Sequence, residues 1–290
     1  MSSSKLWHDY LELCKPRVVA LMLLTALVGM YLAIDKDHTI PILVILNSLL
    51  GIGFCAASAA AINHCVDKKI DSMMKRTQNR PVAHGRITVQ QALLFAGLIG
   101  ITGLGILIYF VNPLTAMLTF MTLIGYAGIY TGYLKRATPQ NIVIGGLAGA
   151  APPLLGWTAV TNQLDPQALL LVLIIFTWTP PHFWALSIYR FDEYQHAKIP
   201  MLPVTHGIQY TKLQILLYTI LLVIVSMLPV IIKMSGWLYL SAALVLGSRF
   251  LYWSVQLYCH EQMTYALRTF KFSIIYLTLL FIFLLIDHYL

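Results

Sequence analysis

The chain has 290 residues, of which 59% are hydrophobic and only 10% charged, and its formal net charge is +8. Soluble domains carry about 25% charged residues, so this composition excludes an ordinary soluble globular protein. The basic residues are spread over separate loops and do not line one face, which argues against a nucleic-acid partner. The sequence therefore predicts an integral membrane protein with the lipid bilayer as its surroundings.

Nine apolar runs follow one another, each near the roughly 20 residues that a bilayer-spanning helix needs. They cover residues 18–35, 41–62, 91–111, 114–133, 141–161, 167–189, 211–233, 237–257 and 270–287. No signal-peptide pattern precedes them. We therefore expect an all-α fold with nine transmembrane helices around a central cavity open to the cytoplasmic side. All nine are expected to form a single domain over residues 1–290.

Lysine and arginine mark one side of the membrane. They cluster before the first apolar run and after the second, fourth, sixth and eighth, whereas the opposite loops hold almost only Lys36 and Lys233. Basic residues favour the cytoplasmic side. We therefore expect a cytoplasmic N-terminus and a C-terminus outside. The expected location is the inner membrane of a bacterium. The four cysteines form no C-x-x-C pair, so neither a zinc site nor a disulfide is expected.

An acidic stripe follows the second run. Asn63, Asp67 and Asp71 are four residues apart, and four residues turn an α-helix by about 400°, so the three side chains share one face. Carboxylates hold Mg²⁺ through a few ligands and leave the other positions to water and phosphate oxygens. The stripe therefore predicts a magnesium site with these three residues as ligands. The alternative is a solvated loop whose charges only mark the cytoplasmic side.

Basic residues accompany the stripe. Lys75, Arg76 and Arg80 follow it within a few helical turns, and Lys135 and Arg136 lie in a short turn after the fourth run. Arginine grips phosphate oxygens with two parallel N–H groups. We therefore expect these residues to bind a diphosphate, with a positive-inside anchor as the equal alternative for Lys135 and Arg136.

A third polar segment ends the sixth run. Asp192 and Glu193 are expected at the cytoplasmic rim, level with the acidic stripe, because this run points inward. His182 lies about 15 Å deeper at 1.5 Å per residue. An ionisable residue inside a span indicates a functional site by default, and the alternative is a core histidine bonded to a neighbouring helix. The proline pairs at 152–153 and 180–181 predict either broken helices around a cavity or ordinary kinks.

These motifs resemble those of a known family. The Asn63-x-x-x-Asp67-x-x-x-Asp71 stripe is similar to the first aspartate-rich motif of the UbiA-type intramembrane prenyltransferases, and the nine runs agree with that family over almost the whole chain. Four stretches resemble its haem-prenylating branch. They are Lys75-Arg76-Thr77-x-Asn79-Arg80-Pro81, Tyr133-Leu134-Lys135-Arg136-x-Thr138-Pro139-x-Asn141, Pro180-Pro181-His182-Phe183-Trp184-Ala185-Leu186 and Tyr189-Arg190-Phe191-Asp192-Glu193-Tyr194.

The resemblance implies an enzyme that depends on Mg²⁺. Its donor would be farnesyl diphosphate and its acceptor protohaem IX, whose vinyl group takes the farnesyl group before water captures the resulting cation, giving haem O. A haem A synthase or a terminal oxidase would be its protein partner. The residues expected to be catalytic are Asn63, Asp67, Asp71, Asp192 and Glu193. Haem binding or orientation is expected of His182, Tyr189 and Arg190.

One departure from the family pattern matters. Many members carry a second D-x-x-x-D motif on the sixth span, where this chain has Tyr189 and Glu193. The number of Mg²⁺ ions, one or two, is therefore left open. Two other functions are weighed against haem prenylation. Prenylation of a quinone precursor would be favoured by an intact second motif, and a transporter by charges near the midplane and an internal repeat.

Overall fold

The computed structural model describes residues 3–290, and every regular element in that range is a helix, which confirms the all-α prediction. Within that range, eight helices are long and apolar enough to cross a membrane. A ninth crossing exists if residues 6–13 and 16–32, two helices that meet at 45°, count as one span. The predicted number of nine therefore depends on this bent pair.

The chain divides into two compact units, the first with residues 38–134 and 151–163 and the chain up to Ile34, the second with residues 35–37, 135–150 and 164–290. Helices of the first unit are α1 (Ser3–Leu13), α2 (Pro16–Leu32), α3 (Ile42–Val66), α4 (Lys68–Met73), α5 (Val89–Phe110), α6 (Pro113–Ile124), the π-helix η1 (Gly125–Leu134) and α9 (Pro152–Thr161). Helices of the second are α7 (Lys135–Ala137), α8 (Asn141–Ala150), α10 (Pro166–Tyr189), α11 (Phe191–His196), α12 (Leu202–His206), α13 (Ile208–Val225), α14 (Leu228–Ile231), α15 (Trp237–Cys259) and α16 (Met263–Tyr289). The single domain expected over residues 1–290 stays a prediction.

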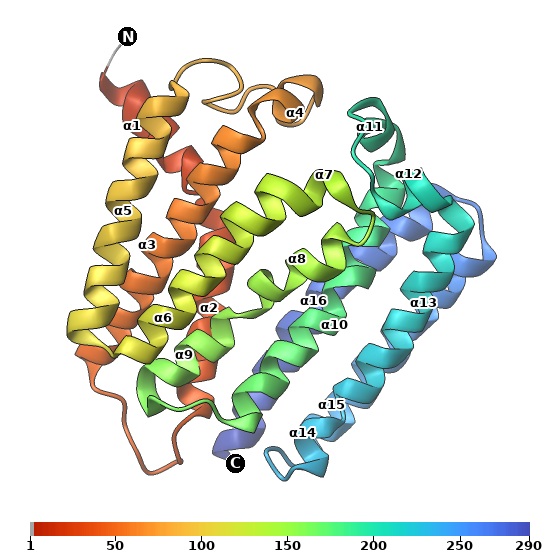
Figure 1. Ribbon diagram of the computed structural model, residues 1–290. Helices are drawn as coiled ribbons and strands as arrows, with labels where there is room; N and C mark the ends of the chain where they lie inside the picture. Colours follow the sequence, from red (N-terminus) through yellow and green to blue (C-terminus); the bar gives the residue numbers. More distant parts are fainter. Residues whose placement is uncertain (1–2) are drawn as a thin grey trace. The chain divides into compact units, whose positions relative to one another are not determined.

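Helix α3 is central to the first unit, where it packs against α2, α5 and α6 (Figure 1). The contact between α2 and α9 is made by backbone atoms. A Cβ atom on Gly29 would collide with the carbonyl of Pro153, and one on Gly156 would collide with the carbonyl of Ala26. Without a side chain at either position the two helices come close enough for van der Waals packing of their backbones.

The loop between α4 and α5 holds helix α1. Arg86 donates from Nε to Asp9 Oδ1 over 2.8 Å, and its Nη2 lies 3.4 Å from Glu12 Oε2. Helix α5 then begins with a capping box, in which Thr88 accepts from the backbone of Gln91 and the Gln91 side chain accepts from the backbone of Thr88. Both features give this loop a defined path next to the acidic stripe.

The two proline pairs behave differently. The fifth span is interrupted at Ala151, directly before residues 152–153, so the broken helix is confirmed there. A proline in the first turn lacks only an N–H that would be unpaired anyway. In the sixth span α10 continues through residues 180–181, and a broken helix there is wrong. Packing of α10 against α8, α13 and α16 offsets the hydrogen bonds that these prolines remove.

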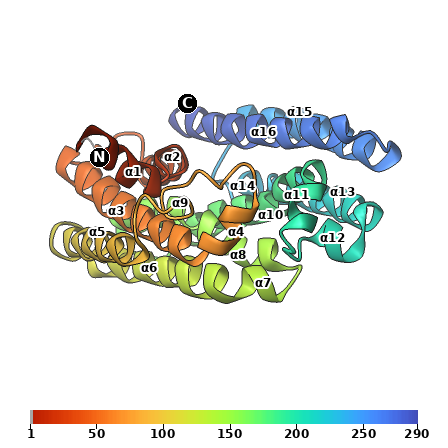
Figure 2. The same cartoon turned by 90° about the horizontal axis from the view of Figure 1, so that it is seen from above.

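Helix α10 is central to the second unit, and α15 lies beside α16 along its length (Figure 2). Polar contacts join these helices. Trp178 Nε1 donates to the Ser273 carbonyl over 2.7 Å. Asp287 on α16 accepts from the backbone N–H groups of Gly236 and Tyr239, and so caps the start of α15.

Candidate functional site

The acidic stripe predicted from its spacing is present, although its helix is interrupted once. α3 ends at Val66 and α4 begins at Lys68, so Asp67 joins them. The helical pattern continues across the join, because Asp67 N donates to Asn63 O over 2.9 Å and Asp71 N donates to Asp67 O over 2.8 Å. The three side chains therefore share one face. They are buried, with Asn63 4%, Asp67 1% and Asp71 3% exposed.

Asn63 is the centre of a polar network. Its Nδ2 donates to Asp67 Oδ2 over 2.8 Å and lies 3.3 Å from Thr131 Oγ1. Its Oδ1 accepts from Lys15 Nζ over 2.5 Å. Thr131 is on the π-helix η1, and its hydroxyl donates to the Tyr126 carbonyl over 2.8 Å. Three segments that are distant in the sequence therefore meet at one amide.

Asp71 is paired with Arg80, one of the predicted diphosphate-binding residues. Arg80 Nη1 lies 2.9 Å from Asp71 Oδ1 and 2.8 Å from Oδ2. The Thr77 hydroxyl donates to the Asp71 carbonyl over 3.0 Å and fixes the start of the loop. A buried carboxylate needs such a partner, because an unpaired charge is costly to remove from water. Arg80 thus supplies positive charge directly beside the stripe.

The other predicted diphosphate-binding residues lie elsewhere. Lys75 and Arg76 are exposed on the loop after α4, and neither forms an ion pair with another described residue. Lys135, half-buried, and Arg136, exposed, form the short helix α7 of the second unit. Within the first unit the structure therefore brings Arg80 to the stripe and leaves Lys75 and Arg76 on the adjoining surface.

Three residues at this site were missed in the sequence. Lys15 is one of the basic residues that mark the cytoplasmic side of the membrane. Its contact with Asn63 spans 48 positions in the sequence, so no spacing rule predicts it. Thr131 lies in the segment in which only the basic residues Lys135 and Arg136 were predicted to bind a ligand. His64 follows Asn63 directly and is 2% exposed. Within the described chain, neither of its ring nitrogens has a hydrogen-bond partner.

The donor set fits a magnesium ion that shares its coordination with a phosphate. Mg²⁺ takes one or two carboxylates and completes its shell with water and substrate phosphates, and Asp67 and Asp71 provide two carboxylates. Asn63 turns its oxygen to Lys15 and its nitrogen to Asp67, so it must rotate its amide to become a ligand. Across residues 3–290 no three His, Cys, Asp or Glu side chains are grouped to hold a metal alone.

In the second unit, His182 is hydrogen-bonded to a neighbouring helix. Its Nδ1 lies 2.7 Å from Ser273 Oγ, and that hydroxyl donates its own proton to the Phe270 carbonyl over 2.6 Å. With the Ser273 proton on the Phe270 carbonyl, His182 Nδ1 is the donor to Ser273, and a neutral ring then has its lone pair on Nε2. The ring stacks on Trp178 with centroids 4.2 Å apart. The Ser273 contact is that expected of a core histidine, and the side chain is buried, at 9% exposed.

The remaining predicted residues lie at the end of α10 and on α11. Arg190 Nη1 is 3.4 Å from Glu193 Oε1, an ion pair within one helical turn. Asp192 is exposed, and Tyr189 is 44% exposed. These residues and His182 belong to the second unit, whereas the acidic stripe belongs to the first.

The fold is that of an intramembrane prenyltransferase. The chain superposes with a TM-score of 0.81 on a solved structure described as digeranylgeranylglyceryl phosphate synthase, at 21% identity over 98% of both chains. A UbiA homologue from Archaeoglobus fulgidus, solved with GPP and Mg²⁺, gives a TM-score of 0.64 at 14% identity, over 95% of this chain and 99% of that one. The model of the UbiA prenyltransferase family matches residues 22–284, so the chain belongs to this family.

Relatives with much higher identity carry a more specific name. The chain is 70% identical to the protohaem IX farnesyltransferase of Legionella pneumophila strain Corby, over 98% of this chain and 96% of that protein. It is 60% identical to protohaem IX farnesyltransferase 1 of Pseudomonas aeruginosa strain UCBPP-PA14, over 99% of this chain and 95% of the relative. The similarity therefore extends through both units.

Proposed function

We infer that this chain transfers the farnesyl group of farnesyl diphosphate to a vinyl group of protohaem, with addition of water, to give haem O. The observation that carries this inference is the 70% identity over 98% of the chain to a protohaem IX farnesyltransferase. The buried acidic stripe with its arginine supplies the charges that loss of a diphosphate needs. Quinone-precursor prenylation has no comparable support in these relatives.

Cleavage of the donor places negative charge on the departing diphosphate, and groups that stabilise this charge lower the barrier. Arg80 is beside the stripe, and Lys75 and Arg76 lie free on the same loop to reach the outer oxygens. Asp67 and Asp71 would hold Mg²⁺, with Asn63 after rotation of its amide. When bound, the ion acts as a Lewis acid on the diphosphate oxygens.

The reaction at the acceptor needs no covalent bond to a protein residue. The C–O bond to diphosphate breaks, a C–C bond forms to the terminal vinyl carbon, and the cation left beside the macrocycle takes a water that then loses a proton. We propose that His182 binds the haem iron through its Nε2 lone pair or orients that water. Tyr189 and Arg190 are proposed to orient haem, and Asp192 and Glu193 are proposed as further catalytic residues.

Location and partner follow from the same inference. The apolar helices make the chain an integral membrane protein. We propose the bacterial inner membrane, with a cytoplasmic N-terminus and delivery of haem O to a haem A synthase or a terminal oxidase. Lys135 and Arg136 are proposed to bind phosphate from α7.

The test is a reaction with purified protein, protohaem, farnesyl diphosphate and Mg²⁺, followed by mass spectrometry of the haem. We expect a prenylated, hydrated haem, no product in EDTA, and recovery when Mg²⁺ is restored. Asp67→Asn, which keeps the shape but not the charge, should abolish turnover. Full activity in EDTA would contradict the metal site. Prenylation of a quinone precursor, with haem left unchanged, would contradict the acceptor.

A further inference from the structure

Arg249 is a charged side chain on a membrane-spanning helix and takes no part in the proposed reaction. It lies on α15, ten residues from the last residue, Cys259, and therefore about 15 Å along the helix. The side chain is exposed on the surface of its unit. Ionisable residues within spans are expensive and usually face a protein interior or a partner, so an outward-facing arginine at this depth calls for a ligand.

A second arginine approaches the same aromatic ring from the neighbouring helix. The guanidinium carbon of Arg249 is 4.9 Å from the ring centroids of both Tyr252 and Trp253. That of Arg268, on α16, is 5.5 Å from the Trp253 centroid and 5.7 Å from that of Tyr265. Because both share Trp253, the two cations are at most about 10 Å apart. Neither has a carboxylate within ion-pair distance among residues 3–290.

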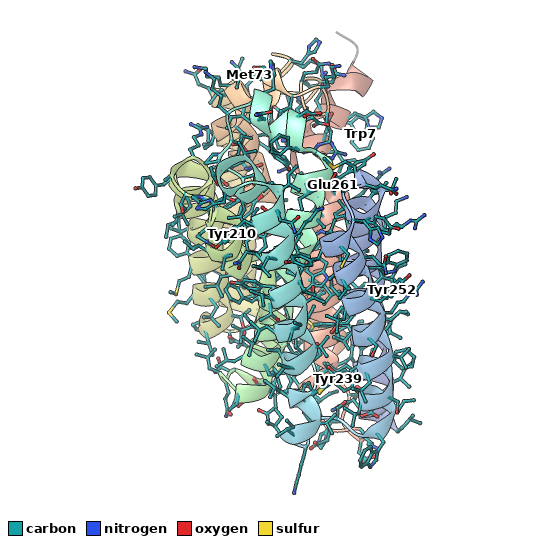
Figure 3. All side chains as sticks on the ribbon, turned by 90° about the vertical axis from the view of Figure 1, so that its right-hand side faces the viewer. Trp7, Met73, Tyr210, Tyr239, Tyr252 and Glu261 are labelled. Carbon is teal, nitrogen blue, oxygen red and sulfur yellow. The ribbon has the colours of Figure 1, made fainter. Side chains whose placement is uncertain are left out.

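Next to these cations is a shallow surface groove of about 590 Å³, lined by Leu244, Val245, Ser248, Arg249 and Tyr252. Figure 3 shows Tyr252 on the outward side of α15. Leu244 is 43% and Val245 70% exposed, so this part of the lining is apolar and open to the surroundings. From Arg249 the groove continues past Ser248 to Val245 and Leu244, toward the start of α15.

We propose that this surface binds an anionic phospholipid, with its phosphate on Arg249 and Arg268 and one acyl chain in the groove. Arg268 is five residues from the start of α16 and Arg249 ten from the end of α15, so both cations lie nearer the hairpin end than the apolar lining residues Leu244 and Val245. A phospholipid of the leaflet at that end has its phosphate outermost and its chains toward the bilayer centre. The protein surface has the same order along the membrane normal, with the two arginines nearer the hairpin end and the apolar residues deeper.

A bound anion also relieves the repulsion between two cations near one ring. Arginine holds a phosphate through parallel N–H groups, and basic pockets on membrane helices favour anionic headgroups. A partner helix with a buried carboxylate would satisfy the charges but does not need an apolar groove that begins beside them. The lipid is therefore the occupant that uses both parts of the site.

The experiment counts bound lipid by native mass spectrometry while purified protein is titrated with phosphatidylglycerol or with phosphatidylcholine of the same acyl chains. We expect one phosphatidylglycerol to bind at least tenfold more tightly than phosphatidylcholine. Arg249→Gln and Arg268→Gln should each reduce this preference about tenfold. Arg17→Gln is the matched control, because it removes the same charge from an exposed position on α2 and should leave the preference unchanged.

Two further variants keep the test decisive if the glutamine variants fold poorly. Arg249→Lys retains the charge and should lose only part of the preference, and Trp253→Leu retains both arginines but should weaken binding severalfold. Equal binding of both lipids by the natural protein would overturn the proposal, as would an equal loss in Arg17→Gln. Displacement by millimolar inorganic phosphate would show a free-anion site instead. A membrane protein cross-linked at position 249, without lipid preference, would identify a partner helix and also overturn it.

Discussion

His64 is a polar side chain that the folded protein buries at a cost. It is 2% exposed, and both ring nitrogens lack hydrogen-bond partners among the described residues. It follows Asn63 on the turn that precedes Asp67, and the charges that act on it are those of Lys15 and Arg80. A diphosphate bound at the stripe would offer it an acceptor.

His64→Leu should therefore stabilise the protein and impair its function. Removing an unsatisfied buried polar group is expected to raise the free energy of unfolding by about 1–3 kcal/mol. Binding of farnesyl diphosphate should weaken, while binding of protohaem stays unchanged. Unfolding in detergent micelles and the two KM values measure this. His84→Leu, at an exposed position, is the control and should change neither quantity. A destabilised His64→Leu would show that the imidazole has a structural partner.

Lys15 places a cation on the Asn63 amide and has a left-handed backbone, with φ 48° and ψ 59°. Lys15→Met keeps the length of the side chain and removes its charge. The substitution takes one positive charge from beside the stripe, so kcat/KM for the donor should fall about tenfold, equivalent to about 1.4 kcal/mol. Lys36→Met removes the same charge at an exposed position and should have no effect. An equal fall for both substrates would assign Lys15 a role in folding.

At the scale of elements, the α2–α9 contact depends on two glycines. Gly156→Ala should lower the free energy of unfolding by about 2–3 kcal/mol or more, because the new methyl group meets a backbone carbonyl that cannot rotate away. Gly105→Ala on α5 is the matched control. Nothing lies within 4 Å of its Cβ position, so the helix should gain up to about 1 kcal/mol. Thermal unfolding in the same detergent compares them, and equal stabilities would contradict the backbone contact.

Element positions were largely predictable from hydropathy, and their ends were not. The last span was expected at 270–287, but α16 begins at Met263. Its first turns carry Arg268 and Lys271, and a prediction from hydropathy alone ends the span before such charged residues. The backbone hydrogen bonds of a helix do not require apolar side chains, so the helix itself continues through them. Similarly, α2 begins at Pro16, where the turn from α1 depends on the backbone of Lys15. Hydropathy therefore predicts which segments cross the membrane, whereas the residue at which each helix ends depends on local backbone geometry.

At the scale of the molecule, whether the number of membrane spans is odd or even determines on which side of the membrane each terminus lies. Nine crossings put the N-terminus and C-terminus on opposite sides, and eight put them on the same side. We expect a cytoplasmic N-terminus and an external C-terminus, since the bent pair α1–α2 forms one crossing. Reporter fusions at each end, one active only in the cytoplasm and one only outside, measure this. Both ends reporting the cytoplasm would exclude α2 as a span.

The site was predictable only where it is local. Residues four apart in sequence were correctly placed on one face, because helical periodicity determines that spacing. Contacts between distant segments were not predictable, since they depend on how helices pack. Asn63 meets Lys15 across 48 positions and His182 meets Ser273 across 91. Those partners determine which atom of each side chain is available to a ligand.

The pairing of Arg80 with both oxygens of Asp71 makes two ligands interdependent. A cation that takes Asp71 must release the guanidinium, and a diphosphate gives that guanidinium a new partner. Each ligand should therefore increase the binding affinity of the other by the same factor, because thermodynamic coupling is reciprocal. A coupling free energy of about 1–3 kcal/mol corresponds to a factor of about 5–150. Calorimetric titrations of Mg²⁺ and inorganic pyrophosphate, in both orders, measure the factor. In Arg80→Gln, Mg²⁺ alone should bind more tightly, and the mutual enhancement should shrink toward one.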